Sequence, residues 1–308
     1  MSQNKRSYAD RLILQGGVNR LIVTFSVLFQ NDKNKAVRYL SDENTSFPAL
    51  FFLLPMIWEN NITDALITKH RTASRICRHI FDLEEYEEAQ AVSKEVNAAL
   101  KWMIVTGEEY DGFHKDLDRV MDTAAAMLLQ IHKDMSVAPV VTRMVFKRNR
   151  TGTYHHDLVW ALFGAKDPAV LRGIATRLTS PNAADVEFAC ELLELENSPN
   201  HQRLYQNYLH WLSENTGYMN FTKNDYNKGS NPKRLRVDYE SKYRCDDNVE
   251  CAATVAFKEM DENQKALLAS YSNRLYQQNK NAWNSFIQKP ISEQIKIAEN
   301  GRGGARWL

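Results

Sequence analysis

Residues 117–135 read LDRVMDTAAAMLLQIHKDM, and their spacing decides the fold class. Apolar side chains recur every three or four residues, at Leu117, Val120, Met121, Ala124, Leu128, Ile131 and Met135. This spacing places them on one face of an α-helix of several turns. The same pattern recurs in residues 92–103 and 267–286, whereas sustained alternation of apolar and polar residues is scarce. The best strand candidate, residues 140–146, is read equally well as a helix. The sequence therefore predicts an all-α fold.

Helix start and stop signals divide the chain further. Gly16-Gly17 predicts a break between two N-terminal helices, and Pro55 divides the apolar stretch 47–58. Residues 261–288 are expected to form one long C-terminal helix. The polar residues 216–248 are expected to form a long loop, because they lack helical periodicity and contain Gly229 and Pro232.

The middle of the chain is predicted to be a series of short helices. Asp167-Pro168, Ser180-Pro181 and Ser198-Pro199 each pair a capping side chain with a proline of a first helical turn. They open expected helices at 168–178, 182–195 and 199–213, after another at 156–164. Short helices with tight connections resemble the stacked pairs of a HEAT-type array. We expect two helical lobes, residues 1–136 and 137–308, with this stack in the second.

Composition excludes several protein classes. The 308 residues are 44% apolar and 25% charged, with a net charge of +1, so the chain is neither disordered nor attracted as a whole to anionic polymers. No stretch is read as a membrane span or a targeting segment, and four cysteines without a CxxC pair are typical of reduced thiols. We therefore expect a cytoplasmic protein that contacts no membrane.

Familiar catalytic signatures (GxGxxG, GxxxxGK[ST], GxSxG and HExxH) do not occur in the chain. Residues 148–157, RNRTGTYHHD, carry an arginine and a histidine at a spacing that resembles the HEPN ribonuclease pattern. The resemblance implies that His155 would move a proton while Arg148 or Arg150 stabilised a phosphate. A non-enzymatic protein is the favoured expectation, with RNA cleavage as the reaction if it is an enzyme, and no cofactor is expected.

Histidines and aspartates elsewhere give no metal site in this interpretation. His114, Asp118 and Asp122 share one helix face, but the interleaved Lys115 and Arg119 favour a solvated polar face. His70 and His79 lie among basic residues and are expected at the surface.

Basic residues gather in two segments that could hold nucleic acid. The predicted phosphate-binding residues are Arg143, Lys147, Arg148, Arg150, Lys233, Arg234, Arg236, Lys242 and Arg244. Tyrosines interleave with those of the long loop, a mixture suited to phosphate contacts and base stacking on RNA or single-stranded nucleic acid.

Acidic segments and the C-terminal tail favour a different function. Glutamates crowd residues 84–88, and an acidic strip follows at Asp185, Glu187, Glu191, Glu194 and Glu196. Patches of both signs in a neutral chain suit head-to-tail association. The tail, residues 301–308, ends in Arg306, Trp307 and Leu308 after Arg302, and is read as a docking peptide for a pocket on this chain or a neighbour. The leading hypothesis is a scaffold or assembly subunit that associates with itself or another protein through this tail and the long basic loop. A nucleic-acid-binding coat or nucleoprotein-like protein and a HEPN-like ribonuclease are the alternatives.

Overall fold

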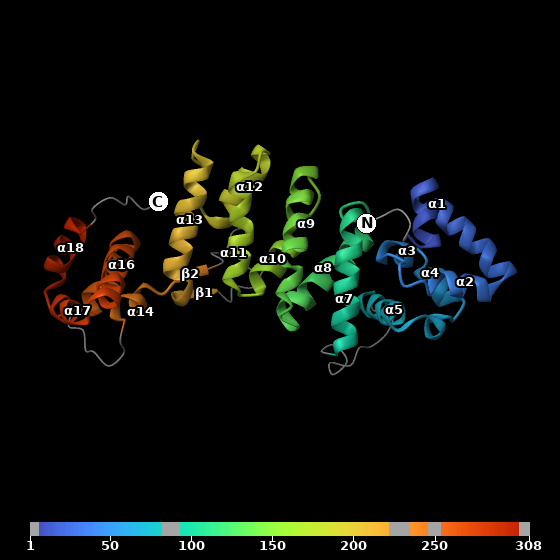
Figure 1. Ribbon diagram of the computed structural model, residues 1–308, viewed down its shortest axis with the longest axis horizontal. Helices are drawn as coiled ribbons and strands as arrows, with labels where there is room; N and C mark the ends of the chain where they lie inside the picture. The colour runs from blue at the N-terminus through green and yellow to red at the C-terminus, as the bar shows by residue number, and fades with distance from the viewer. Residues whose placement is uncertain (1–5, 82–92, 222–234, 246–253, 302–308) are drawn as a thin grey trace. The chain divides into compact units, whose positions relative to one another are not determined.

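The computed structural model of the chain describes residues 6–81, 93–221, 235–245 and 254–301 (Figure 1). It is mostly helical (78%), with 13 substantial helices in the part described, which confirms the predicted helical class. The chain divides into two compact units. The N-terminal unit comprises Met1–Gly173 and Asn182–Phe188, and the C-terminal unit comprises Ile174–Pro181 and Ala189–Leu308. The expected lobe boundary near residue 136 falls inside the N-terminal unit, just before a helix.

The N-terminal unit is built from helices of very different lengths (Figure 1). These are α1 (Tyr8–Asn31), α2 (Lys33–Leu40), α3 (Phe47–Phe51), α4 (Leu54–Glu59), α5 (Thr68–Ile80), α7 (Lys94–Gly107), α8 (Lys115–Ala126), α9 (Ala138–Thr151), α10 (His156–Gly164) and the larger part of α11 (Pro168–Ala175). A π-helical segment, Met127–Ile131, continues α8 within the stretch predicted as one helix. The candidate strand 140–146 belongs to α9.

Two predicted breaks in this unit are confirmed. Gly16 and Gly17 have non-helical backbone angles inside α1, and the φ of +71° at Gly17 is one that side-chain-bearing residues rarely adopt. The apolar stretch 47–58 divides into α3 and α4, with Pro55 in the first turn of α4. Glycine and proline thus act here as the local rules require.

Helix α1 is the one helix among the described residues that is long and apolar enough to cross a membrane, judged by length and composition. Only 22% of its most apolar window is buried, and Leu14, Val23 and Val27 are at least half exposed. The sequence reading overlooked this helix because Asp10, Arg11 and the glycine pair interrupt it. Its kink leaves two pieces that are each shorter than a bilayer core of about 30 Å, at about 1.5 Å per residue.

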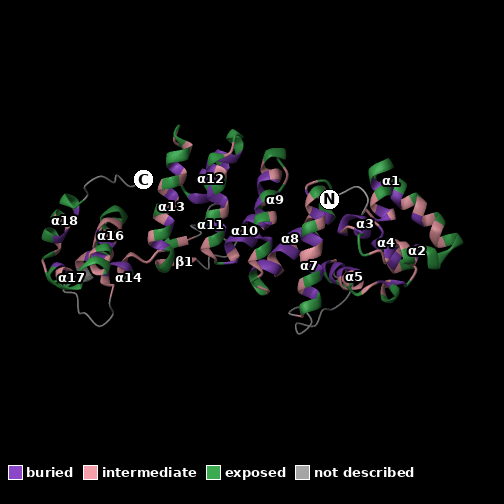
Figure 2. Ribbon diagram, viewed as in Figure 1, coloured by how far each residue is buried: buried purple, intermediate pink, exposed green. Residues whose placement is uncertain are grey.

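The core of the N-terminal unit lies between α7, α8, α9 and α10, which pack against one another (Figure 2). Leu100, Met121, Phe146 and Leu162 contribute fully buried side chains, one from each helix. Burial of such side chains contributes about 1.5–3 kcal/mol each. The apolar stripe therefore faces the core from Leu117 to Leu128 as its spacing predicts, whereas Ile131, at the end of the π-helical segment, is half exposed.

The short helices predicted in the middle of the chain are present. α10 begins and ends at the predicted residues, while α12 (Ala183–Leu193) and α13 (His201–Asn215) differ from prediction by one or two residues at each end. α11 ends at Ala175 and a 3-10 turn, Thr176–Thr179, follows it. Asn200 caps α13, its side chain accepting a hydrogen bond from the backbone N–H of Arg203.

The expected long loop 216–248 contains ordered elements in its described parts. Strands β1 (Met219–Phe221) and β2 (Leu235–Val237) pair antiparallel, with Asn220 opposite Arg236. Both three-residue strands place a polar residue between two apolar ones, too short an alternation to be recognised in the sequence. A short helix, α14 (Tyr239–Arg244), follows β2 and is capped by Asp238.

The expected long C-terminal helix is also wrong. The chain forms α15 (Thr254–Lys258), α16 (Glu262–Gln278), α17 (Lys280–Ile287) and α18 (Ile291–Asn300), so the last helix is short. Asn279 ends α16 with extended backbone angles and caps α17 through its side chain, which accepts from the N–H of Ala282. A capping side chain can therefore divide a continuous apolar stripe between two helices.

The core of the C-terminal unit gathers on Trp283 of α17. Its indole N–H donates to Ser272 Oγ at 2.8 Å, and Ser272 in turn donates to the carbonyl of Tyr243 at 2.6 Å. Tyr243 stacks on Phe257 and donates to the buried Gln294 at 2.8 Å. This network joins α14, α15, α16, α17 and α18 in one apolar cluster.

Candidate docking groove

The basic residues of α9 bind groups of their own unit. Arg143 forms two hydrogen bonds to the carboxylate of Glu108, at 2.6 and 2.8 Å. Lys147 donates to the backbone carbonyls of Glu108 and Glu109 at 3.3 and 3.1 Å. Both side chains therefore fasten α9 to the end of α7, where exposed carbonyls attract cations.

Arg150 binds the acidic strip that the sequence places in α12. Its Nη1 lies 2.8 Å from Oδ1 of Asp185, whose side chain is almost fully buried. Asn149 also donates to the carbonyl of Ala184 at 3.5 Å. One predicted basic patch and one predicted acidic strip thus partly neutralise each other within the chain.

Arg148 lies at the centre of a buried ionic cluster. The side chain is 1% exposed, and its Nε lies 3.0 Å from both carboxylate oxygens of Asp111. Nη1 donates to Asp122 at 3.1 Å and to the carbonyl of Tyr154 at 3.0 Å, while Asp118 lies 3.7 Å from Nη2. The guanidinium therefore fastens the turn before α8, the helix α8 and the turn after α9 to each other.

Three carboxylates around one guanidinium leave an excess of negative charge in this cluster. Burial raises the pKa of Asp122 to about 7, against the opposing effect of Arg148. Burial by itself would lower the pKa of Arg148, but its bonds to Asp111 and the charge of Asp122 outweigh burial and raise it. Burial also raises the pKa of Asp118. The solvated polar face predicted for α8 is therefore wrong at Asp122, because tertiary packing covers it.

Substitution of Asp122 by asparagine tests the charge excess through pH. The folded-state pKa of Asp122 lies above the unfolded value of about 3.9, so its ionisation lowers the free energy of unfolding as pH rises from about 4 to 7. Asp122→Asn removes this titration. We expect the stability of the variant relative to wild type, measured by urea unfolding, to increase between pH 4 and pH 7. Asp116→Asn on the exposed face of α8 controls for the lost charge, and a difference independent of pH would contradict the assignment.

The remaining candidate catalytic residue, His155, is half-buried at the start of α10. Its Nδ1 lies 3.0 Å from the carbonyl of Thr153, and its ring contacts Phe188 edge-on at 4.9 Å. Arg148 and Arg150, its expected partners in a ribonuclease site, hold Asp111, Asp122 and Asp185 instead. No three acidic, histidine or cysteine side chains in the described ranges are arranged to hold a metal ion.

The second basic segment is placed only in part. Lys242 is 1% exposed and donates to Asn215 at 2.9 Å and to Ser270 at 3.1 Å, so it is a structural residue. Burial lowers its pKa, against the opposing charge of Glu214. Arg236 is exposed on β2, and Arg244 is half-buried. Lys233, Arg234, Arg302, Arg306, Trp307 and Leu308 lie outside the described residues.

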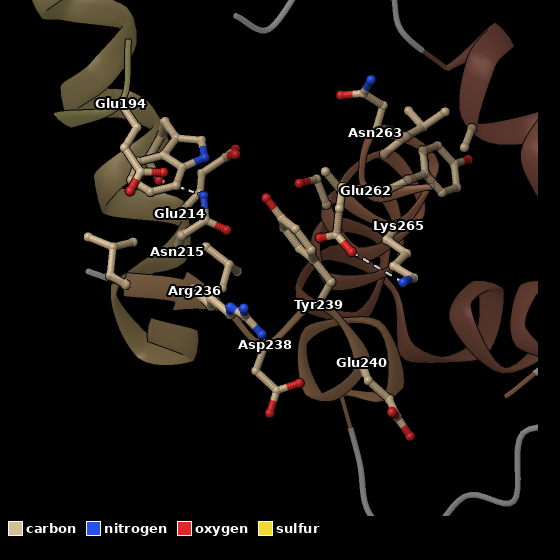
Figure 3. A pocket seen from close by; sticks show the side chains of 18 of the residues that line it. Glu194, Glu214, Asn215, Arg236, Asp238, Tyr239, Glu240, Glu262, Asn263 and Lys265 are labelled. Carbon is tan, nitrogen blue, oxygen red and sulfur yellow. Dashed lines mark hydrogen bonds and ion pairs between the residues drawn. The ribbon is translucent and has the colours of Figure 1, made fainter. Parts of the chain in front are cut away.

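A groove of about 1120 Å³ opens in the C-terminal unit, beside β2 (Figure 3). One wall is formed by the end of α12 and by α13, and the other by α14 and α16. Tyr239 projects from the start of α14 toward the space between the walls (Figure 3). Two hydrogen bonds from the buried side chain of Lys242 in α14 connect this helix to α13 and to α16. Sequence reasoning did not find this site, because its walls come from segments distant in sequence.

The apolar lining of the groove is rich in aromatic side chains. Tyr208 and Trp211 of α13 stack with ring centroids 5.4 Å apart, and Leu192 and Leu193 extend this surface. Burial raises the pKa of Tyr239, and the nearby charge of Glu262 adds to the effect. Aromatic side chains of this kind dominate the binding free energy of many protein interfaces.

The charged lining of the groove differs between its two walls. On the α14–α16 side, Glu262 pairs with Lys265 at 3.2 Å and Glu240 with Lys258 at 3.4 Å. On the other wall, Glu194 and Glu214 form no ion pair with a lysine or arginine among the described residues; His210 lies 3.7 Å from Glu214. The α12–α13 wall therefore offers two carboxylates to a cationic ligand. The acidic strip 185–196 was the sequence signal that could have indicated Glu194.

Comparisons with protein-family models, with curated proteins and with solved structures give no significant match.

Proposed function

We propose that the chain is a non-enzymatic helical scaffold that docks an extended, basic and aromatic peptide segment in the groove of its C-terminal unit. The observation that carries the proposal is that two carboxylates, Glu194 and Glu214, which form no direct ion pair with a lysine or arginine among the described residues, lie on the same wall as the stacked rings of Tyr208 and Trp211. The groove volume is also above the roughly 300–1000 Å³ of typical small-molecule sites, which favours a longer ligand.

Two features of the fold that the sequence predicts are also part of this proposal. A HEAT-like stacking of the short helices within 156–213, and an arrangement in two lobes, would suit a scaffold, because stacked helix pairs expose extended binding surfaces. The proposal also includes self-association of the chain and a cytoplasmic location. Free thiols at Cys77, Cys190 and Cys245 support that location.

The alternatives gain less support from the described residues. At least five of the nine predicted phosphate-binding residues hold partners inside the chain, among them Arg143, Lys147, Arg148, Arg150 and Lys242. A ribonuclease would need Arg148 or Arg150 free to meet a phosphate beside His155. Docking of a protein segment is therefore the function that this geometry supports best.

A labelled peptide tests the proposal. Fluorescence anisotropy would follow a fluorescein-labelled hexapeptide, Arg-Trp-Gly-Arg-Trp-Gly, added to the full chain and to a chain shortened to residue 301. We expect saturable binding that Glu214→Lys weakens by about tenfold or more, because a like charge replaces an attractive one. Glu299→Lys on the exposed face of α18, outside the groove, should leave the affinity unchanged. Binding to neither chain, or an equal loss in both variants, would refute the proposal.

A further inference from the structure

The chain leaves its last described helix at the edge of this groove. Gly301 lines the groove, and its carbonyl accepts a hydrogen bond from Arg274 at 3.4 Å. A Cβ on Gly301 would lie 2.6 Å from the ring of Tyr271, so a larger residue at this position would require that ring to shift. The last described residue therefore lies on the groove itself.

The length of this segment matches the site. Seven residues span at most about 23–25 Å when extended, more than twice the roughly 10 Å edge of a cube with the groove's volume of about 1120 Å³. No intervening linker is needed, since Gly301 already belongs to the lining.

The residue types of segment 302–308 also suit the lining of the groove. The segment RGGARWL carries Arg302 and Arg306, then Trp307 and Leu308. Arg306, which follows Gly301 by five residues, suits the carboxylates on the opposite, α12–α13 wall, and the tryptophan and leucine suit the aromatic surface next to them. Glycines and alanine between the arginines leave the backbone room to lie close to the wall.

From these observations we infer that residues 302–308 dock into the groove of their own chain and compete there with partner segments. The inference rests on the proposed function and identifies how the same site is regulated. A segment joined directly to its site has a millimolar effective concentration, so even weak contacts keep it bound within one chain. A partner must displace it, and partners with a similar arginine and aromatic pattern are favoured.

Limited proteolysis of the full chain tests the docking directly. Trypsin cleaves after Arg302 and Arg306, and intact-mass spectrometry follows the initial loss of the tail. We expect the double variant Glu194→Gln/Glu214→Gln and, separately, Trp307→Ala to lose the tail about tenfold faster than wild type. Glu299→Gln, which neutralises an acid close to the tail but outside the groove, should match wild type. Equal cleavage rates in all four proteins would overturn the inference.

Peptide binding separates this inference from the proposed function. The labelled hexapeptide should bind the chain shortened to residue 301 about tenfold more tightly than the full chain. Equal affinity for both chains would refute the internal docking and leave the groove as a peptide site, whereas binding to neither would refute the proposed function. Tail protection that increases with protein concentration, together with a larger mass by light scattering, would place the tail in a second copy and overturn docking within one chain.

Discussion

Arg148→Met lowers the free energy of unfolding by about 3–5 kcal/mol, the largest effect we expect for any charged residue of the chain. The substitution keeps most of the side-chain volume but removes the positive charge that faces Asp111 and Asp122. Both carboxylates are buried, at 0% and 8% side-chain exposure, so water cannot replace the lost guanidinium. Urea unfolding followed by circular dichroism measures the change.

Arg143→Met is the matched control on the same helix. Its ion pair with Glu108 is half exposed, and exposed pairs contribute about 0–1 kcal/mol. The loss of unfolding free energy in Arg148→Lys should lie between those of the two methionine variants. Lysine keeps the positive charge but lacks the planar guanidinium that donates to two oxygens at once. Equal losses of unfolding free energy in Arg143→Met and Arg148→Met would contradict the prediction. They would show that burial does not increase the contribution of the Arg148 cluster to stability.

The expected loss of stability also affects how RNA-cleavage assays of Arg148 variants are interpreted. Loss of RNA cleavage in an Arg148 variant would be uninformative unless the variant were shown to be folded. His155→Ala is the cleaner variant, because the described bond of this ring, to the carbonyl of Thr153, lies within one turn.

Trp283→Ala is the second large expected effect, a loss of about 3–5 kcal/mol from the C-terminal unit. The indole is 1% exposed, contacts Tyr276 edge-on at 4.9 Å and donates to Ser272. Truncation therefore opens a cavity and leaves a buried hydroxyl with one partner fewer. Urea unfolding again measures the total, and hydrogen exchange with mass spectrometry shows which helices lose protection.

Two further variants separate the effect of losing the Trp283 ring from the effect of a substitution at the surface. Trp283→Phe keeps most of the ring volume and should cost less than the alanine variant, while Asn284→Ala, at an exposed neighbouring position, should change stability by no more than about 0.5 kcal/mol. We expect Trp283→Ala to reduce protection in α14 and α16 while α7 and α8 keep theirs, since Trp283 belongs to one compact unit and α7 and α8 belong to the other. Uniform loss of protection across the chain would contradict that division.

Local sequence rules predicted the helical elements well where local chemistry decides them. The apolar stripe faces the core from Leu117 to Leu128, Gly16-Gly17 breaks α1, and the short helices α11 to α13 begin within two residues of their predicted positions, although Asn200 rather than the predicted Ser198 caps α13. These features depend on side-chain periodicity and on backbone angles within a few residues. They are therefore readable without knowledge of the fold.

The same rules failed where a distant segment decides the outcome. His70 was expected at the surface, yet it is fully buried against the carbonyl of Leu40 at 2.7 Å, and burial lowers its pKa to about 4. The break at Asn279 was also missed, since an apolar stripe runs on across it while the Asn279 side chain caps α17 through the N–H of Ala282.

What the sequence determined by itself was the helical class, most helix boundaries, and the presence of basic and acidic segments of opposite sign. Only the tertiary structure decided how those charges are used. It pairs the basic residues of α9 with Glu108, Asp111 and Asp185, while it leaves Glu194 and Glu214 facing an aromatic groove. The physical reason is that a charge is free or neutralised according to its neighbours within a few ångströms, and those neighbours come from segments 35 or more residues away.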